Sequence, residues 1–226
     1  MSENKSQQQL DMNETLSKSE AFVVKNKKKL IGGVILIVVL VAGFMLYGNF
    51  VSGPKNEKAG TMLAKGQQYF AANEYDKALN GDGNGYIGFL KIIKEYSGTD
   101  AANLANLYAG LSFAQQDKAK EAIPYLEKFS TQDDDMVSAA AISALGNCYA
   151  KEKQLDKAVE TLKTAAKLAD NNSLSPIYLL EAGMILESQK KNSEAKDLYQ
   201  QIKDNYYESS IAQEIDKYIE RASTAK

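Results

Sequence analysis

The residues whose types could do chemistry gather in one short stretch, residues 80–88. Five of them match positions 1, 3, 5, 6 and 8 of a calcium-binding loop, namely Asn80, Asp82, Asn84, Gly85 and Ile87. Position 12, where calcium needs a bidentate glutamate, is Lys91, and position 1 is asparagine instead of aspartate. Because one carboxylate does not offset the dehydration of a divalent ion, we expect no metal site and interpret the stretch as a glycine-rich connector.

Other catalytic or cofactor-binding patterns are equally incomplete. Gly83 to Gly88 spell G-x-G-x-x-G, but a dinucleotide site needs a preceding β-strand, and a helix is expected there. The chain has no histidine, so it lacks the commonest general base and metal ligand. Its single cysteine, Cys148, excludes an intrachain disulfide, and its place inside an expected helix favours burial. We therefore expect no catalytic residues and no cofactor.

The composition and the net charge indicate whether a nucleic acid could be the partner. The chain has 226 residues, is 44% apolar and carries a net charge of only −2. After residue 50 it has 21 basic and 25 acidic side chains. Because nucleic-acid binding calls for a basic face, we expect no nucleic-acid partner.

A period in glycine and alanine predicts the elements around this connector. Four glycines are each followed twelve positions later by an alanine: Gly66 and Ala78, Gly110 and Ala122, Gly146 and Ala158, Gly183 and Ala195. The glycines lie 44, 36 and 37 residues apart, which indicates a helical hairpin of about 34 residues, the tetratricopeptide length. We expect the glycine of one helix to meet the alanine of its partner, with larger residues four positions after the alanine. In the first repeat an insertion of eight residues makes Leu90 the expected equivalent.

The predicted fold is all-α. It consists of an N-terminal transmembrane helix, a right-handed TPR-like α-solenoid of about four helical hairpins, and a C-terminal capping helix. We expect a polar segment over 1–29, the anchor over 30–50 and the extracytoplasmic TPR domain over 51–226. The repeats are predicted at about 56–97, 100–133, 136–170 and 174–207, with the cap at 209–223. Asp133 to Asp135 are expected to cap the third repeat, and Pro176 to lie in the first turn of the fourth.

Residues Leu30 to Phe50 are uncharged over 21 positions, long enough to cross a bilayer as a helix. Lysines at 18, 25, 27, 28 and 29 precede the run and outnumber Lys55, Lys58 and Lys65 after it. This bias predicts an N-terminus in the cytoplasm and a repeat domain on the other side. The alternative is a cleavable signal peptide, which the length of the apolar run and the lack of an Ala-x-Ala site disfavour.

The inner face of each first helix is the surface on which we expect a partner. The repeat register places nine residues there: Gln67, Phe70, Leu107, Leu111, Ser143, Asn147, Lys151, Leu180 and Met184. The alternative for the leucines and for Phe70 is packing inside the domain. With one obvious cation, this groove lacks the clustered positive charges that grip a terminal carboxylate. A helix or an extended apolar segment of another protein is the expected guest.

The layout resembles a known family. An acidic N-terminal segment, the run Lys25-Asn26-Lys27-Lys28-Lys29, one anchor helix, a short spacer, and repeats that contain the motifs starting at Tyr108 and Ala144 resemble the YfgM-type bacterial inner-membrane tetratricopeptide proteins. The glycine-rich insertion at 80–88 and the absence of tryptophan depart from that pattern. The resemblance implies a periplasmic, chaperone-like factor beside the protein-export channel, with the translocon, a periplasmic chaperone or exported polypeptides as partners. It implies no catalytic residues.

Three other hypotheses, two about function and one about orientation, stay open from the residues alone. One is a scaffold for an envelope complex unrelated to export. Another is an enzyme, which loss of function from Asp82→Ala with folding intact would indicate. The last is the opposite orientation, with the repeats in the cytosol.

Overall fold

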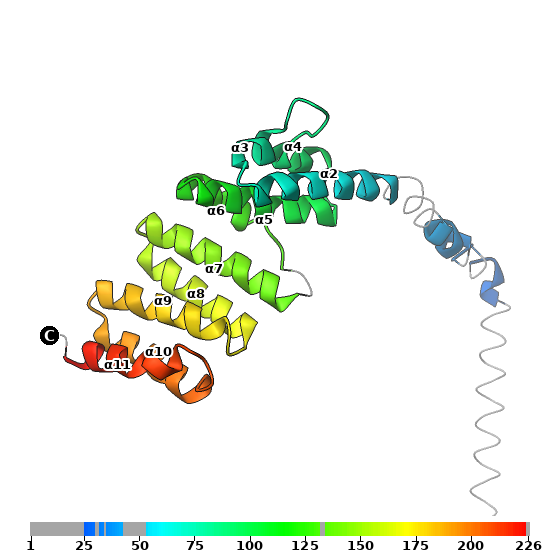
Figure 1. Ribbon diagram of the computed structural model, residues 1–226. Helices are drawn as coiled ribbons and strands as arrows, with labels where there is room; N and C mark the ends of the chain where they lie inside the picture. Colours follow the sequence, from blue (N-terminus) through cyan, green and yellow to red (C-terminus); the bar gives the residue numbers. More distant parts are fainter. Residues whose placement is uncertain (1–24, 30–31, 34, 43–52, 132–133, 225–226) are drawn as a thin grey trace, which may run out of the picture. The chain divides into compact units, whose positions relative to one another are not determined.

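The computed structural model describes residues 25–29, 32–33, 35–42, 53–131 and 134–224. Within these ranges every regular element is a helix, which confirms the predicted all-α class for that part of the chain (Figure 1). The chain divides into two compact units, residues 1–54 and 55–226.

The first unit contains part of the expected anchor. Residues 32–33 and 35–42 are helical, and the large side chains from Ile35 to Val41 each expose 50–63% of their surface. The rest of the expected anchor, at 30–31, 34 and 43–50, lies outside the described residues, as does the polar segment over 1–24. Among the described residues no helix is both long and apolar enough to span a membrane. The anchor therefore stays a prediction.

The second unit is a stack of helical hairpins. Its first repeat holds α2 (Gly53–Ala71), α3 (Tyr75–Asn80) and α4 (Phe89–Glu95). The next three pair α5 (Asp100–Gln115) with α6 (Ala119–Leu126), α7 (Asp135–Lys151) with α8 (Leu155–Ala169), and α9 (Ser175–Ser188) with α10 (Asn192–Asn205). A 3₁₀ turn, η2 (Ala212–Glu214), and α11 (Ile215–Thr224) follow. From α4 onwards each helix packs on the next, so the stack buries its core between neighbours.

Local side chains start the helices as predicted. The Asp134 carboxylate accepts hydrogen bonds from the Met136 and Val137 backbone N–H groups, at 3.0 and 3.1 Å, which caps α7. Asp133 lies outside the described residues. Pro176 lies in the first turn of α9, where its missing N–H costs no helical hydrogen bond.

The link between the two helices of each hairpin has a feature that the sequence pattern does not reveal. Each link is three residues long, and its middle residue has a φ of 59–61°. These residues are Asn73, Asp117, Lys153 and Lys190, each seven positions after the repeat glycine. Since a non-glycine residue in the left-handed region costs roughly 1–2 kcal/mol, packing of the two helices must offset that cost in every repeat.

Each repeat glycine accommodates a side chain of the second helix. A Cβ added to Gly110 would lie 2.6 Å from Leu126 Cγ, one on Gly146 would lie 2.9 Å from Leu162 Cγ, and one on Gly183 would lie 2.3 Å from Tyr199 Cε1. The residue covering the glycine is thus the large one, four positions after the alanine. The four repeat alanines, Ala78, Ala122, Ala158 and Ala195, are fully buried. The expectation that glycine meets alanine is therefore refined: the glycine makes room first for a leucine or tyrosine, and at Gly146 the Ala158 carbonyl oxygen also lies within 3.4 Å of the added Cβ.

In the first repeat this position belongs to Phe89, and the expectation of Leu90 is wrong. A Cβ on Gly66 would lie 2.4 Å from Phe89 Cε1 and 2.2 Å from the Tyr86 hydroxyl oxygen. Phe89 and Ile92 are fully buried, whereas Leu90 is only partly buried. The insertion therefore returns the chain to the core one residue earlier than the spacing of the other repeats predicts.

The C-terminal cap, helix α11, is held on the last hairpin by a buried side chain and by an ion pair. Ile215 of α11 is fully buried against the last repeat. Arg221 Nε donates to Glu187 Oε1 of α9 at 2.9 Å, and the Tyr199 hydroxyl donates to Glu187 Oε2 at 2.8 Å. The side chain of Glu187 is only 15% exposed, so this carboxylate joins α9, α10 and α11 at a sheltered point.

Candidate functional site

The carboxylate of Asp82 holds the glycine-rich connector in place. Its Oδ2 lies 2.7 Å from Lys65 Nζ and accepts a 2.7 Å hydrogen bond from the Tyr69 hydroxyl, both on α2. Its Oδ1 accepts from the backbone N–H groups of Asn84 and Tyr86 at 2.8 and 3.0 Å. The side chain is 5% exposed. Both oxygens are thus occupied by partners from the chain itself, which leaves neither free for an incoming cation.

Two glycines of the connector allow its backbone to adopt positive φ angles and to pass close to another backbone segment. Gly88 has a φ of 87°, and a Cβ there would lie 2.3 Å from the Leu79 carbonyl oxygen. Gly81 has a φ of 99°, and a Cβ there would lie 2.4 Å from the Tyr86 carbonyl oxygen. Two backbone segments therefore cross here at a distance that only glycine permits. Among the described residues, no three His, Cys, Asp or Glu side chains are grouped as metal ligands. We interpret the connector as structural.

We expect Asp82→Asn to lower the urea midpoint of unfolding at pH 7. The variant keeps an acceptor for the connector backbone but loses the charge that pairs with Lys65. The pair, with the Tyr69 hydroxyl, holds the pKa of the Asp82 carboxyl well below its usual range. The pKa of Asp82 is lower in the folded chain than in the unfolded chain. Its contribution to the free energy of unfolding is therefore present above a pH of about 4 and is lost as the pH falls further. The difference between variant and wild type, measured by circular dichroism, should shrink between pH 5 and 2.

Glu95→Gln is the matched control, because Glu95 is an exposed acid of α4 outside the connector. It removes the same charge without touching Lys65. Equal midpoints for the two variants at pH 7, or a difference between Asp82→Asn and wild type that is as large at pH 2 as at pH 7, would contradict the role assigned to Asp82.

In the described part of the repeat unit, four large apolar side chains are exposed on two first helices. Met136 and Val137 of α7 expose 58% and 39% of their surface, and Ile177 and Met184 of α9 expose 39% and 49%. Ile177, Glu181 and Met184 are spaced i, i+4, i+7 and therefore share one face of α9. Asn147 of α7 donates from Nδ2 to Glu181 Oε2 at 3.3 Å, so the two helix faces meet. We call this the α7–α9 face; it comprises Met136, Ala140, Asn147, Ile177, Glu181 and Met184.

The structure distributes the nine residues predicted for the partner groove over three environments. Leu107 and Ser143 are 5% and 6% exposed and lie in the interior, which leaves no room for a guest to reach them. Phe70 packs edge-on against the Tyr75 and Tyr108 rings, with centroids 5.5 and 5.3 Å away. The remaining six are half-buried or exposed; half-buried are Gln67, Leu111 and Leu180, and exposed are Asn147, Lys151 and Met184. Asn147 and Met184 lie on the α7–α9 face.

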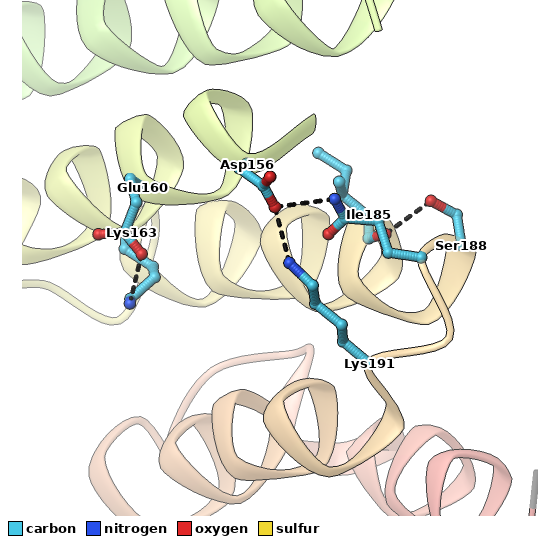
Figure 2. A network of polar contacts seen from close by, with 7 residues as sticks. Asp156, Glu160, Lys163, Ile185, Ser188 and Lys191 are labelled. Carbon is cyan, nitrogen blue, oxygen red and sulfur yellow. Dashed lines mark hydrogen bonds and ion pairs between the residues drawn. The ribbon is translucent and has the colours of Figure 1, made fainter. Parts of the chain in front are cut away.

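Lys151, the one cation predicted for the groove, is already paired. Its Nζ lies 2.6 Å from Asp117 Oδ1 in the link of the preceding hairpin. A different ion pair joins the next two hairpins, where Lys191 Nζ lies 2.7 Å from Asp156 Oδ1 of α8 and Gln189 Nε2 donates to the same oxygen at 2.9 Å (Figure 2). These contacts join neighbouring hairpins at exposed positions. They give Lys151 a structural partner, so it offers little charge to a guest.

Glu181 and Ile177 belong to this surface but are not among the predicted groove residues. Counted from Gly183, the repeat register selects Leu180 and Met184. It does not select Ile177 or Glu181. The signal that could have found them is the i, i+4, i+7 spacing of Ile177, Glu181 and Met184, in which an acid lies between two apolar residues of one helix face.

The helical stack has counterparts among known proteins. Residues 20–218 match the family described as tetratricopeptide repeat-like domain. No curated protein matches the sequence significantly. Two crystal structures of a kinesin light chain from Podosopora anserina, described as having nearly identical TPR-like repeats and one of them a point variant, are similar in fold. Both have a TM-score of 0.51 and 12% identity; they cover 74% of this chain, which in turn covers 85% and 86% of theirs. At this identity the likeness shows the fold alone.

Proposed function

Because this chain belongs to the family of tetratricopeptide repeat-like domains, as the match over residues 20–218 shows, we propose that it binds other proteins of the bacterial cell envelope while held at the inner membrane. The observation that carries the proposal is the α7–α9 face. Three of its large apolar side chains, Met136, Ile177 and Met184, are exposed, and a partner that covered them would remove this apolar surface from water. A helix or an extended apolar segment of a partner would cover them.

The membrane anchor is part of the same proposal. The sequence supplies an uncharged run over 30–50, and its described part, 32–33 and 35–42, is helical with exposed apolar side chains. Lysines concentrated before this run favour a cytoplasmic N-terminus and a periplasmic repeat domain. Confinement to the bilayer surface would raise the effective concentration of the repeat domain towards other membrane proteins, so weak contacts on the α7–α9 face can suffice.

Resemblance to the YfgM-type family favours a site of action beside the protein-export channel. There the protein would act as an ancillary, chaperone-like factor for exported polypeptides. The alternative is a scaffold for an envelope complex unrelated to export. Purification in mild detergent followed by mass spectrometry separates the two, because export components and their substrates would be enriched only in the first case.

Crosslinking in cells tests the interaction surface. A photoreactive amino acid at Met184 of the full chain is expected to give adducts with envelope or export proteins. The same amino acid at Lys196, which is exposed on the second helix α10, is the matched control and should give few adducts. Equal adducts from both positions, or none above background from Met184, would remove the proposed use of this face.

Protease added to intact spheroplasts tests the orientation. The proposal expects digestion of the repeat domain without lysis, since it faces outwards. Protection until the membrane is broken would place the repeats in the cytosol and would overturn the proposed location.

A further inference from the structure

Glu181 is a sheltered acid on the α7–α9 face, whose large exposed side chains are apolar except for Asn147. It lies on α9 between Ile177 and Met184, one turn from each, and its side chain is half-buried. Its one hydrogen bond in the described part of the chain comes from the Asn147 amide, at a long 3.3 Å. Burial raises the pKa of its carboxyl, which the weak Asn147 contact opposes only in part.

Two other sheltered carboxylates of the chain each meet a cation. Asp82 is paired with Lys65 at 2.7 Å, and Glu187 with Arg221 through two hydrogen bonds. Glu181 has no ion-pair partner among the described residues. Lys151, the lysine nearest to it along the α7 face, is committed to Asp117. Removing water from an unpaired carboxylate is costly, so covering this face with a purely apolar guest would be opposed by Glu181.

A guest that carries a cation would supply the ion-pair partner that Glu181 lacks, and the ion pair would offset the cost of removing water from its carboxylate. We propose, on the basis of the function given above, that the α7–α9 face receives a segment of another protein in which a lysine or arginine lies between apolar residues. The basic side chain pairs with Glu181, and its apolar neighbours cover Ile177 and Met184. Asn147 of α7 keeps the Glu181 carboxylate in place by donating to its Oε2, while Oε1 of Glu181 accepts from the guest.

Charge complementarity selects this occupant over an acidic one. An acidic segment would bring a second negative charge to a sheltered carboxylate, which is repulsive in a poorly solvated place. A second copy of the chain could not use its only arginine, because Arg221 is held by Glu187 within each copy, but it would also present lysines; self-association of the full chain without peptide, lost in Glu181→Gln, would identify that occupant instead. A lysine- or arginine-bearing apolar segment satisfies both the charge and the exposed side chains.

Three fluorescein-labelled peptides test this with the full chain in lipid nanodiscs. They share serine and glycine ends and leucine flanks, and differ in one central residue, which is lysine, glutamine or glutamate. Fluorescence anisotropy, corrected with empty nanodiscs, should show the lysine peptide binding about tenfold more tightly than the glutamine peptide and the glutamate peptide binding most weakly, as expected for a desolvated charge pair. Glu181→Gln should remove the preference for lysine, and Glu181→Lys should shift it to the glutamate peptide.

Glu160→Gln is the matched control. Glu160 is an exposed acid on α8 that pairs with Lys163 at 2.9 Å, away from the α7–α9 face (Figure 2). Its loss should leave the preference for lysine unchanged. Circular dichroism confirms that each variant is folded, and Glu181→Gln is isosteric and can still accept from Asn147.

The outcomes separate this inference from the proposed function. Equal binding of the lysine and glutamine peptides, with Met184 adducts still formed in cells, would overturn the role of Glu181 and leave the binding face standing. A preference for lysine that survives Glu181→Gln would also overturn it. If no peptide binds and Met184 gives no adducts, the proposed function fails together with the inference.

Discussion

Replacing Phe89 by alanine is expected to lower the free energy of unfolding by about 3–5 kcal/mol, the range for loss of a buried phenylalanine. Phe89 is fully buried, and its ring stacks on Tyr108 of α5 with centroids 5.6 Å apart. It also fills the space above Gly66 of α2. The variant therefore removes contacts that join the first repeat to the second. Urea unfolding of the full chain, followed by far-ultraviolet circular dichroism, measures the loss.

Leu90→Ala is the control for this prediction, because it deletes a large side chain at the adjacent position. Leu90 is only partly buried, so its loss should cost clearly less than that of Phe89. A Leu90→Ala variant as unstable as Phe89→Ala would restore the register expected from the other repeats.

The fold follows from the sequence because its period has a local physical cause. A small residue at a fixed position on one helix, matched by a large one on the next, recurs in four repeats whose glycines make room for Leu126, Leu162, Tyr199 and Phe89. The caps are also local: Asp134 and Pro176 act on the first turn of their own helix. Such features need no knowledge of distant contacts.

The first repeat was harder to predict because spacing does not show how an insertion folds. Counting eight extra residues leads to Leu90, but the actual length depends on where the connector rejoins the core. That point is set by Asp82, which turns the chain by accepting from the Asn84 and Tyr86 backbone and ties it to α2 through Lys65 and Tyr69. These contacts join residues 13 and 17 positions apart, and no periodic pattern reports them.

The positive-φ residues in the links were equally hidden. Asn73 and Asp117 are types that tolerate the left-handed region, but Lys153 and Lys190 are not. The conformation there is imposed by the packing of the two helices around a three-residue link. Sequence types therefore predict two of the four positions at most.

The α7–α9 face, which we propose as the binding surface, was predicted only in part, because α9 is apolar on most of its sides. In the stretch Pro176 to Leu186 the apolar residues do not form one stripe, so the pattern alone does not tell which of them face solvent. Leu179 and Leu186 became core, whereas Ile177 and Met184 stayed exposed. The neighbouring hairpin decides between them, and its position is a property of the folded stack.

Adding one methyl group at two glycines of α2 is expected to change stability in opposite directions. At Gly66 a Cβ would lie 2.2 Å from the Tyr86 hydroxyl oxygen and 2.4 Å from Phe89 Cε1. Tyr86 cannot move away freely, because its hydroxyl donates to the Ala78 carbonyl at 2.7 Å and its ring is buried. We expect Gly66→Ala to destabilise the domain by about 1–3 kcal/mol, as overpacked cores do.

At Gly60, inside the same helix, a Cβ would meet no atom within 4 Å. Alanine there removes the helix penalty of glycine, so Gly60→Ala should stabilise by roughly 0.5–1 kcal/mol. The two variants share the chemistry and the helix and differ only in what lies opposite, which isolates the close approach as the cause. Urea midpoints on the full chain would show the opposite signs. A Gly66→Ala variant as stable as Gly60→Ala would mean that α2 can draw back from α4 without loss, and the close fit at the repeat glycine would then not be what fixes the hairpin.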